Sequence, residues 1–512
     1  MTTLPGTPTS YWLDSTPRTD FAPLSGEHMA DVCVVGGGIC GLTTALLLAR
    51  AGRSVVVVEA DRVVEGVTGY TTAKVTSQHN LVYDHLRRHF GDSGARTYAD
   101  ANQAGLAFIA GLVEQEGIDC DFSRQHNVVY TEAADEVSTF EAELAALQAA
   151  GLPAELVTET SLPFPVAAAL RVADQAQFHP RKYLLHLTRL ITDAGGVIVE
   201  QSRVVDVDEG SPSVVRTEGG AVRANHVVVT THLPILDRGL FFAKCHPFRD
   251  YVLAAPIEAA RAPKGMFIST ESPTHSIRTT PHEGGLLLIV GGEGHKTGQE
   301  PDTEERYRCL ADWVTARFGV SDFRYRWSTQ DNASADRVPY IGRLRRTSGH
   351  LWTATGFSGW GMTGGTVAGL LLADLVQAID NPWRDLYDPQ RINPVASGPT
   401  LLKENADVGL RFVSDRLRTM KTGDPNALAP GEAQVMLCGG RRCAAYRDDQ
   451  GTLHAVSAVC THLGCVVSWN GAERSWDCPC HGSRFSVDGA VLQGPAVRDL
   501  EPVDVPKGSA AP

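Results

Sequence analysis

Four cysteines and two histidines lie within one short segment near the C-terminus. The segment, CTHLGCVVSWNGAERSWDCPCHGSRF, covers residues 460–485 and contains C-x-H-x-x-C, a gap of twelve residues, and C-x-C-H. Thiolates and imidazoles brought together from two loops are ligands that zinc and iron prefer. The spacing therefore predicts a metal centre, and a zinc knuckle is the simplest alternative that it leaves open.

A second candidate site lies near the N-terminus, in DVCVVGGGICGLTTALLLARAG. Gly36, Gly38 and Gly41 have the G-x-G-x-x-G spacing. The first glycine permits a tight turn, the second lets the backbone approach a pyrophosphate, and the third lets a helix pack on a strand. Glu59 ends the next apolar run, where a carboxylate can accept hydrogen bonds from a ribose. The pattern predicts a dinucleotide cofactor but does not decide between FAD and NAD.

The elements that position these residues follow from hydrophobic periodicity. A buried strand, a glycine turn, a helix and a second strand form a βαβ unit at the N-terminal site. The pattern predicts a mostly helical segment at about 85–175 and an antiparallel sheet at 241–325. Residues 386–429 have Pro and Gly at both ends of one amphipathic helical segment, which is typical of a connector. Short strands with Gly and Asp turns then predict a small all-β module.

Bulk properties limit the class of protein. A chain of 512 residues suggests about three domains. The formal net charge of −13 argues against a nucleic-acid partner. No apolar run is long enough to span a membrane, and the N-terminus lacks the basic start and apolar core of a secretory signal, so a cytoplasmic location is expected. The cysteines outside residues 460–485 are most simply small buried hydrophobes.

Residues of about 30 to 385 resemble the D-amino acid oxidase family of flavoproteins, which includes glycine and sarcosine oxidases. Besides the glycine turn, the matching pieces are GVTGYTTAK, ANHVVVTTHLP, VPYIGRL and ATGFSGWGMTGG. The resemblance implies FAD and an α/β FAD/NAD(P)-binding (Rossmann-like) domain with an inserted α+β substrate domain. It places the following residues at the cofactor: Gly36, Gly38, Gly41, Glu59, Thr71, Thr72, Lys74, Val204, Gly356, Gly359, Gly361 and Met362.

The sequence departs from this family at two positions. Members with covalent flavin have a histidine soon after the ribose carboxylate, whereas this chain has Tyr70 near that place, so non-covalent FAD is expected. Members that oxidise amino acids often have an arginine eight residues before the PYIG proline, to bind a substrate carboxylate. Asp331 occupies that position here. The substitution favours an amine or another donor without a carboxylate.

Three polar residues are candidates for the chemistry near the flavin. Lys74 would stabilise negative charge on the reduced flavin if the resemblance holds, and a structural ion pair is the alternative. His79 has the same two interpretations. Arg278 lies on a predicted strand, so it has an even chance of facing the substrate cavity or solvent.

Residues of about 430 to 508 resemble the Rieske iron-sulfur family, because CTHLGC and CPCHGS are both complete. The resemblance implies a [2Fe-2S] cluster in which Cys460 and Cys478 bind one iron and His462 and His481 bind the other. Two histidine ligands raise the reduction potential to roughly −150 to +300 mV. The cluster histidines are expected to be exposed, as in that family.

The resemblance extends to residues around the cluster. Cys465 and Cys480 match the pair that forms a disulfide in Rieske proteins of cytochrome bc complexes. Ser483 matches a serine that hydrogen-bonds a cluster sulfur, and Phe485 stands where those proteins commonly have a tyrosine. One hydrogen bond is then missing, which predicts a somewhat lower potential than theirs.

The chain is thus expected to be an FAD-dependent oxidoreductase with a Rieske domain that transfers electrons. The expected donor is a small molecule, and an amine is the expected substrate class. Hydride transfer from this donor would reduce FAD, and the cluster would exchange electrons with an external acceptor or donor protein. The alternatives are an electron-transfer or redox-sensing protein without substrate turnover, and an oxygen-reducing oxidase. The expected division is a lead (1–30), an oxidoreductase domain (31–385), a connector (386–429) and a Rieske domain (430–508). Within the oxidoreductase domain, the FAD-binding parts are 31–85, 176–240 and 326–385, and the cap parts are 86–175 and 241–325.

Overall fold

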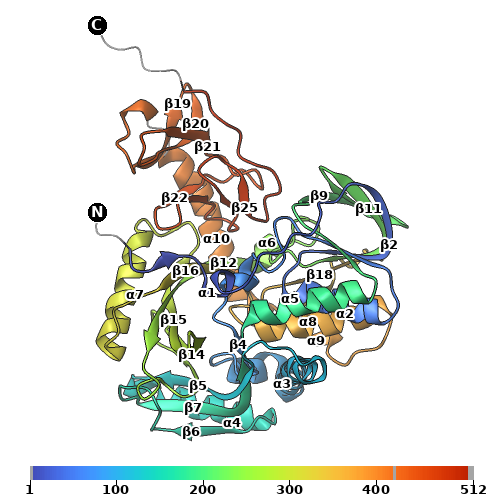
Figure 1. The fold of residues 1–512 in the computed structure, drawn as a ribbon, viewed down its shortest axis with the longest axis vertical. Helices are drawn as coiled ribbons and strands as arrows, with labels where there is room; N and C mark the ends of the chain where they lie inside the picture. The colour runs from blue at the N-terminus through green and yellow to red at the C-terminus, as the bar shows by residue number, and fades with distance from the viewer. Residues whose placement is uncertain (1–3, 419–421, 506–512) are drawn as a thin grey trace.

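The computed structural model describes residues 4–418 and 422–505. A large body contains the N-terminal glycine turn, and a smaller domain with the cysteine-rich segment lies at one end of it (Figure 1). Among the described residues, no helix combines the length and the apolar character needed to cross a membrane.

The first sheet of the large body carries the glycine turn. Five of its strands are parallel along the path, whereas β17 is antiparallel to β18, and β10 and β9 extend the sheet from β11. The order is β17 (Tyr340–Arg343), β18 (Leu351–Thr355), β11 (Gly220–Val229), β2 (Gly26–Val35), β3 (Val55–Val58) and β8 (Val197–Val199), with β10 (Ser213–Thr217) and β9 (Val204–Asp208) attached.

Both faces of this sheet are covered, which explains its valine-rich strands. Val32 and Val34 of β2 pack with the helices α2 (Ile39–Arg50), α5 (Pro180–Asp193) and α8 (Gly361–Val376). Cys33 and Val35 face the opposite side and join a second core with β9, β10 and β11. The predicted βαβ unit is confirmed, with β2, α2 and β3 in the expected places.

The second sheet belongs mainly to the inserted parts of the chain. Its order is β1 (Thr7–Pro8), β16 (Tyr325–Ser334), β12 (Cys245–Ile257), β15 (Gly285–Lys296), β14 (Ser276–His282), β13 (Met266–Ser269), β5 (Ser123–Thr131), β7 (Ala168–Gln177) and β4 (Lys74–Val75), and β6 (Ala154–Val157) pairs with β7. Strands β12, β14 and β15 pair antiparallel, as predicted for 241–325. The helix α7 (Thr303–Phe318) packs on β12 and β15 and was not predicted.

The prediction of a mostly helical segment at 85–175 is confirmed for two long helices, but it missed three strands. The helices α3 (Tyr83–Glu116) and α4 (Val137–Ala149) are present, but β5, β6 and β7 lie in the same segment and extend the second sheet. Short apolar runs do not distinguish strands from helices by periodicity alone. Short helices complete the large body: α1 (Tyr11–Asp14), η1 (Val67–Tyr70), η2 (Ala134–Glu136), α6 (Phe241–Lys244) and α9 (Arg384–Tyr387).

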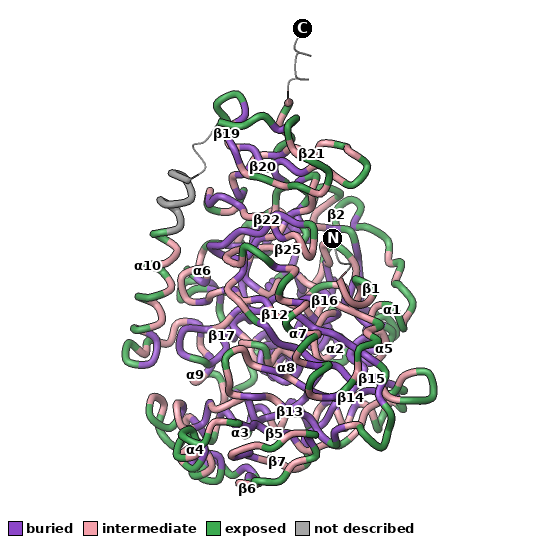
Figure 2. The backbone as a smooth tube through the Cα atoms, turned by 90° about the vertical axis from the view of Figure 1, so that its left-hand side faces the viewer, coloured by how far each residue is buried: buried purple, intermediate pink, exposed green. Residues whose placement is uncertain are grey.

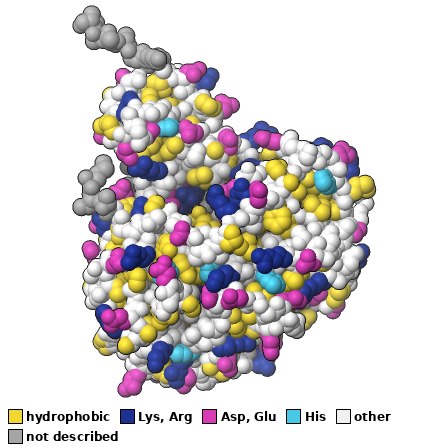
Figure 3. Space-filling model, viewed as in Figure 1, with side chains coloured by type: hydrophobic (Ala, Val, Ile, Leu, Met, Phe, Trp, Pro, Cys, Tyr) yellow, Lys and Arg dark blue, Asp and Glu magenta, His cyan; other side chains and the backbone are white. Residues whose placement is uncertain are grey.

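The C-terminal domain is all-β, as predicted. One antiparallel sheet contains β19 (Ala433–Cys438), β20 (Arg441–Arg447) and β21 (Leu453–Ser457), and another contains β22 (Ser468–Asn470), β23 (Ser475–Asp477), β24 (Arg484–Phe485) and β25 (Val491–Gln493). Buried segments run through its interior (Figure 2). The helix α10 (Pro394–Arg418) and the turn η3 (Pro425–Ala427) precede it along the chain. In Figure 3 this domain is a separate lobe, and Lys and Arg side chains gather around the hollow beneath it.

A buried ion pair attaches the chain after α9 to the FAD-binding part. Arg391 contacts both carboxylate oxygens of Asp336, with distances of 2.7 and 2.8 Å, and donates to the carbonyl of Pro339. Its guanidinium carbon lies 4.0 Å from the centroid of the Tyr340 ring. The exposed fractions of the two paired side chains are 9% and 3%. Because both charges are shielded from water, either one left alone would be strongly destabilising.

Replacing Asp336 with alanine should therefore lower the free energy of unfolding by roughly 3 kcal/mol or more. The matched control is Asp322→Ala, which breaks the exposed pair of Asp322 with Arg324 and should cost about 1 kcal/mol at most. Urea unfolding followed by far-ultraviolet circular dichroism measures both. Equal losses in the two variants would contradict the anchoring role of the buried pair.

Candidate functional site

The glycine turn after β2 is built for close approach of a ligand. Gly36 has φ +110°, and a Cβ there would lie 2.7 Å from the carbonyl oxygen of Thr230. A Cβ on Gly41 would lie 2.0 Å from the carbonyl oxygen of Gly36. Helix α2 begins at Ile39, and its N-cap residue, Gly38, has no side chain that could cap the helix. The N–H of Ile39 donates to the hydroxyl of Thr68 at 3.3 Å, so the N–H groups available to an anion come from the residues that follow Ile39 in the first turn of α2.

Glu59 lies beside this turn, directly after β3. Its carboxylate accepts hydrogen bonds from the backbone N–H groups of Gly37, at 2.6 Å, and Asp61, at 3.0 Å. Burial raises the pKa of Glu59 above its usual value. Each carboxylate oxygen can accept more than one hydrogen bond, so the group can still receive ribose hydroxyls.

A cavity of about 1430 Å³ extends from the glycine turn toward the second sheet. Ten of the residues predicted for the cofactor line it: Gly36, Gly38, Glu59, Thr71, Thr72, Lys74, Val204, Gly359, Gly361 and Met362. Gly41 and Gly356 are not among the lining residues. Gly41 packs α2 against the turn, and Gly356 has φ +80° with Ser334 and Cys245 close to its Cα. Their predicted direct contact with FAD stays a prediction, whereas their backbone roles are clear.

The start of α8 forms a second open helix end at this cavity. Its N-cap residue Trp360 makes no side-chain capping hydrogen bond, and nothing lies within 4 Å of a Cβ placed on Gly361. The N–H of Gly359 is not free, because it donates to Oδ2 of Asp331. The space at Gly361 and the open N–H groups of this helix end fit a bound flavin. The N–H donors to the flavin would be those of Gly361 and the residues after it.

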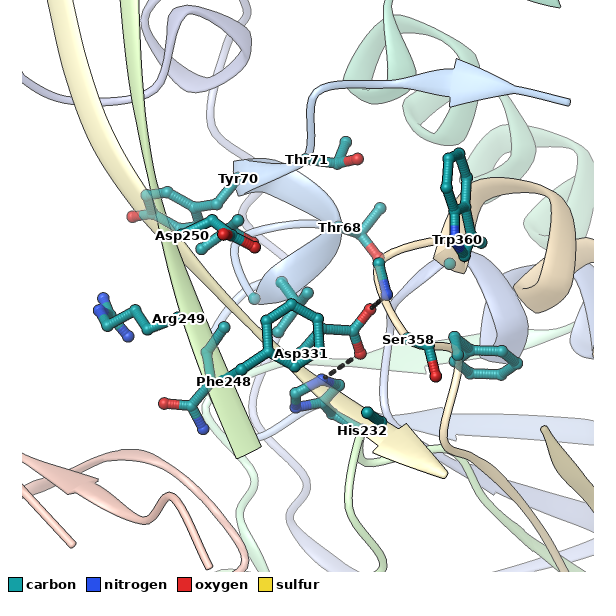
Figure 4. A pocket seen from close by; sticks show the side chains of 18 of the residues that line it. Thr68, Tyr70, Thr71, His232, Phe248, Arg249, Asp250, Asp331, Ser358 and Trp360 are labelled. Carbon is teal, nitrogen blue, oxygen red and sulfur yellow. Dashed lines mark hydrogen bonds and ion pairs between the residues drawn. The ribbon is translucent and has the colours of Figure 1, made fainter. Parts of the chain in front are cut away.

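Asp331 and His232 connect the two sheets at this end of the cavity (Figure 4). Oδ1 of Asp331 lies 3.1 Å from Nε2 of His232 and accepts from the N–H of Asn332. Asp331 is thus committed to contacts within the protein. An arginine that binds a substrate carboxylate is replaced here by an acidic residue that would repel such a group.

Lys74 lies in the cavity wall, and its Nζ donates to the hydroxyl of Ser276. Burial, together with the positive charge of Arg278, lowers the pKa of Lys74 to about 7. His79 also lines the cavity, stacks on Trp360 and hydrogen-bonds the hydroxyl of Tyr98 at 2.6 Å. Burial lowers the pKa of His79 to about 3, so this ring is neutral.

Arg278 is placed elsewhere, outside the residues that line the cavity. Its guanidinium donates to the carbonyls of Thr72, Ala73 and Phe178 and lies over the ring of Trp12. Burial lowers the pKa of Arg278 to about 9. These contacts hold the backbone next to Lys74, and a direct catalytic role of Arg278 stays a prediction.

The predicted cluster ligands converge on two adjacent loops of the C-terminal domain. The side chains of Cys460 and Cys478 hydrogen-bond each other, and the rings of His462 and His481 have centroids 5.1 Å apart. Nδ1 of each histidine is buried and has no hydrogen-bond partner among the described residues. Two thiols and two unengaged imidazole nitrogens suit a Rieske [2Fe-2S] cluster.

Cys465 and Cys480 form a disulfide between the two loops, as the resemblance implied. Their sulfurs and that of Cys478 lie within 4.8 Å of one another, but two of the three are consumed by the bond. The hydroxyl of Ser483 hydrogen-bonds Cys460 and accepts from the N–H of Ala496.

The cluster loops face the large body, so the expectation of exposed histidines is wrong. Nε2 of His462 lies 2.8 Å from Oδ1 of Asp237, and the ring of Phe242 contacts both histidine rings. The exposed fraction is 5% for the His462 side chain and 6% for His481. Packing of the two domains removes the exposure that an isolated Rieske domain would have.

Further contacts join the cluster domain to the cavity wall. Gln330 donates to the carbonyl of Gly482 at 2.8 Å, and Gln493 lies 3.2 Å from Nδ1 of His232. Glu473 accepts from the hydroxyl of Tyr307 at 3.0 Å. Sequence reasoning missed the contacts of Gln330, Gln493, Tyr307 and Asp237, because each is a single polar residue without a motif. His232, Glu473 and Gly482 lie within quoted segments, but their contacts between the domains were not predicted.

Comparisons with known proteins agree with this geometry. Residues 31–375 match the family described as FAD dependent oxidoreductase, and residues 419–504 match the Rieske [2Fe-2S] domain. The chain is 37% identical over 500 residues to the Rieske 2Fe-2S iron-sulfur protein YhfW of Bacillus subtilis, which covers 97% of this chain and 98% of that protein. It is 26% identical to the gamma-glutamylputrescine oxidoreductase of Escherichia coli, over 80% of this chain and 98% of the relative.

A solved structure shares the fold of the large body. The glycine oxidase from Geobacillus kaustophilus superimposes with a TM-score of 0.60 and 18% identity. The match covers 71% of this chain and 99% of the oxidase.

Gly41→Ala should prevent normal FAD binding, because its Cβ would meet backbone at 2.0 Å. Overpacking of about 1–3 kcal/mol corresponds to a roughly fivefold to 150-fold loss of FAD affinity. The control is Gly111→Ala, where nothing lies within 4 Å of the added Cβ. FAD content and its dissociation constant, measured by absorbance and fluorescence, check this. Unchanged affinity in Gly41→Ala would refute the turn as the pyrophosphate site.

Cys460→Ser should abolish the electron paramagnetic resonance (EPR) signal of the reduced cluster and lower the iron content, because one iron loses a thiolate ligand. Cys309→Ser is the control, since Cys309 is free and exposed. A metal held instead by Cys478 with the disulfide cysteines would survive the Cys460 substitution. Iron retained at the wild-type level would therefore overturn the ligand assignment.

Proposed function

Because the chain belongs to the FAD dependent oxidoreductase family and has a C-terminal Rieske [2Fe-2S] domain, we propose that it oxidises a small amine and passes the electrons to an external acceptor. When bound, FAD takes a hydride from a carbon–hydrogen bond, and a Rieske cluster exchanges single electrons. FAD is proposed to be held without a covalent bond, with Tyr70 in the cavity wall.

One observation carries the relay: residues of both domains line the same cavity. Gly36 and Glu59 lie at one end of it, and Glu473, Arg484 and Gln493 of the Rieske domain line another part. The cluster histidines face the large body through Asp237 and Phe242. A cluster domain that served stability alone would not need its ligand loops at this surface.

The cavity residues support an amine as the donor. Asp331 stands at the position where an arginine could bind a substrate carboxylate, and it contacts His232 and the N–H of Gly359 instead. With a pKa of about 7, Lys74 can be uncharged near neutral pH and can take a proton from a donor nitrogen. A relative named gamma-glutamylputrescine oxidoreductase fits the same class.

The test is an anaerobic titration of the wild-type protein and of Cys460→Ser with putrescine and with γ-aminobutyrate. These donors have the same number of carbon atoms, but one terminal aminomethyl group of putrescine is a carboxylate in γ-aminobutyrate. Putrescine should bleach the flavin in both proteins and should produce the reduced-cluster EPR signal in wild type only. γ-Aminobutyrate should be the poorer donor by at least tenfold in reduction rate, because acidic groups line the cavity.

Each part of the proposal can fail separately. Flavin bleaching without a cluster signal in wild type would contradict the relay. Failure of every amine in a wider panel to bleach the flavin would contradict the dehydrogenase. Oxygen consumption by Cys460→Ser as fast as by wild type would point to an oxidase instead.

A further inference from the structure

Strands β12 and β16 together form one wall of the cavity. Phe248 pairs with Asp331, and Asp250 pairs with Thr329, in an antiparallel register without interruption. Side chains two apart on a strand, and those of directly paired residues, share a face of the sheet. All four residues line the cavity. Figure 4 shows Asp250 beside Tyr70, across the pocket from Trp360.

Asp250 has no hydrogen bond or ion pair within the part of the chain that the structure describes. Its nearest charged influences are Asp331, which repels its charge, and Arg249, which attracts it. Arg249 donates through one nitrogen to the hydroxyl of Ser328 and lies 3.7 Å from Glu473, whereas its Nε and Nη1 have no hydrogen-bond partner among the described residues. Burial and the charge of Asp331 raise the pKa of Asp250 to about 7. An enclosed carboxylate without a partner is costly, and a cation would offset that cost.

The backbone makes room for this carboxylate. A Cβ on Gly294 of β15 would lie 2.2 Å from Oδ1 of Asp250. The register between β12 and β15 shifts between Arg249 and Tyr251, next to Asp250. Any side chain at Gly294 would displace the Asp250 carboxylate from the cavity wall, so the glycine preserves its position.

We propose that Asp250 binds the positively charged nitrogen of the substrate, so that the cavity selects a cationic amine. This inference rests on the proposed amine oxidation and adds the residue that recognises the amine. The ammonium group would sit between Asp250 and the ring of Tyr70, where an aromatic face also favours a cation. A substrate carboxylate at this point would lie beside two acidic residues, Asp250 and Asp331, which would weaken its binding.

A metal ion is a weaker candidate for this position. A bound divalent cation needs several oxygen or nitrogen ligands around one point. Among the described residues, the only convergent group of metal-ligating side chains is that of Cys465, Cys478 and Cys480. A single organic cation requires just one carboxylate and a cavity.

The test measures binding rather than turnover. tert-Butylammonium has no hydrogen on the carbon next to nitrogen and cannot be oxidised there, and tert-butanol is its neutral counterpart of the same shape. Calorimetry of both ligands with the oxidised holoenzyme would be run at about pH 8.5, above the pKa of Asp250 and below that of an alkylammonium. Asp250→Asn, Asp250→Glu and Asp385→Asn would be compared with wild type.

Asp250→Asn should weaken tert-butylammonium binding by about tenfold to a hundredfold, which is the value of a charged hydrogen bond. tert-Butanol binding should not change. Asp250→Glu should restore part of the affinity, and Asp385→Asn, which removes an exposed carboxylate, should match wild type. FAD content and the cluster EPR signal of each variant establish that it is folded and loaded.

Two results would overturn the inference: equal binding of tert-butylammonium to wild type and Asp250→Asn, or wild-type binding no tighter than that of tert-butanol. The proposed oxidation is judged independently, by flavin bleaching with amines. Bleaching that persists without any effect of Asp250 on cation binding would leave amine oxidation standing and reject this residue. Cation binding that depends on Asp250, without flavin bleaching by any amine, would support the role of Asp250 and reject amine oxidation.

Discussion

The antiparallel pairing of β12 with β16 is the constraint on which both sites depend. Because the side-chain period of a strand is two, the register decides which residues face the cofactor cavity. Asp250 and Asp331 belong to one set of alternate positions, and Arg249 and Gln330 to the other. The first set supplies carboxylates to the cavity, and the second, which also reaches the cavity, contacts Glu473 and Gly482 of the cluster domain. A slip of one residue would exchange the two sets and lose both sites together.

The same cavity combines opposite electrostatic requirements along its length. At the FAD-binding end, the open N-termini of α2 and α8 favour negative charge, as a pyrophosphate needs. At the wall formed by β12 and β16, enclosed carboxylates favour a cation. Lys74 lies on another part of the wall, with a pKa lowered toward neutrality by burial and Arg278. The positive potential at the helix ends comes from backbone N–H groups, whereas the negative potential at the wall formed by β12 and β16 comes from individual side chains.

Local sequence motifs made the glycine turn and the cluster ligands predictable. Residues whose positions depend on strand pairing or on domain packing could not be predicted. Gly36, Glu59 and the Cys-His boxes could be assigned because a turn or a loop holds them close in sequence. The division of residues 85–175 into helices and strands could not, since β5, β6 and β7 are defined by the partners they pair with. The orientation of Arg278 depended on the same pairing. Asp250 and Asp237 carry no motif, and only the register and the packing of two domains give them a place.

The position of the cluster domain would favour electron exchange with the cavity over electron exchange with an external protein. With the rings of His462 and His481 covered by Asp237 and Phe242, an external redox protein cannot touch either imidazole in this arrangement. The contacts that hold the domain include polar ones, such as Gln330 with Gly482, and interfaces between domains of one chain often permit relative motion. Tight docking shortens the route between the cavity and the cluster, while access for an external acceptor requires another surface of the domain or its release. In the proposed relay, the strength of the contacts between the domains would therefore set the balance between electron exchange with the cavity and electron exchange with an external protein.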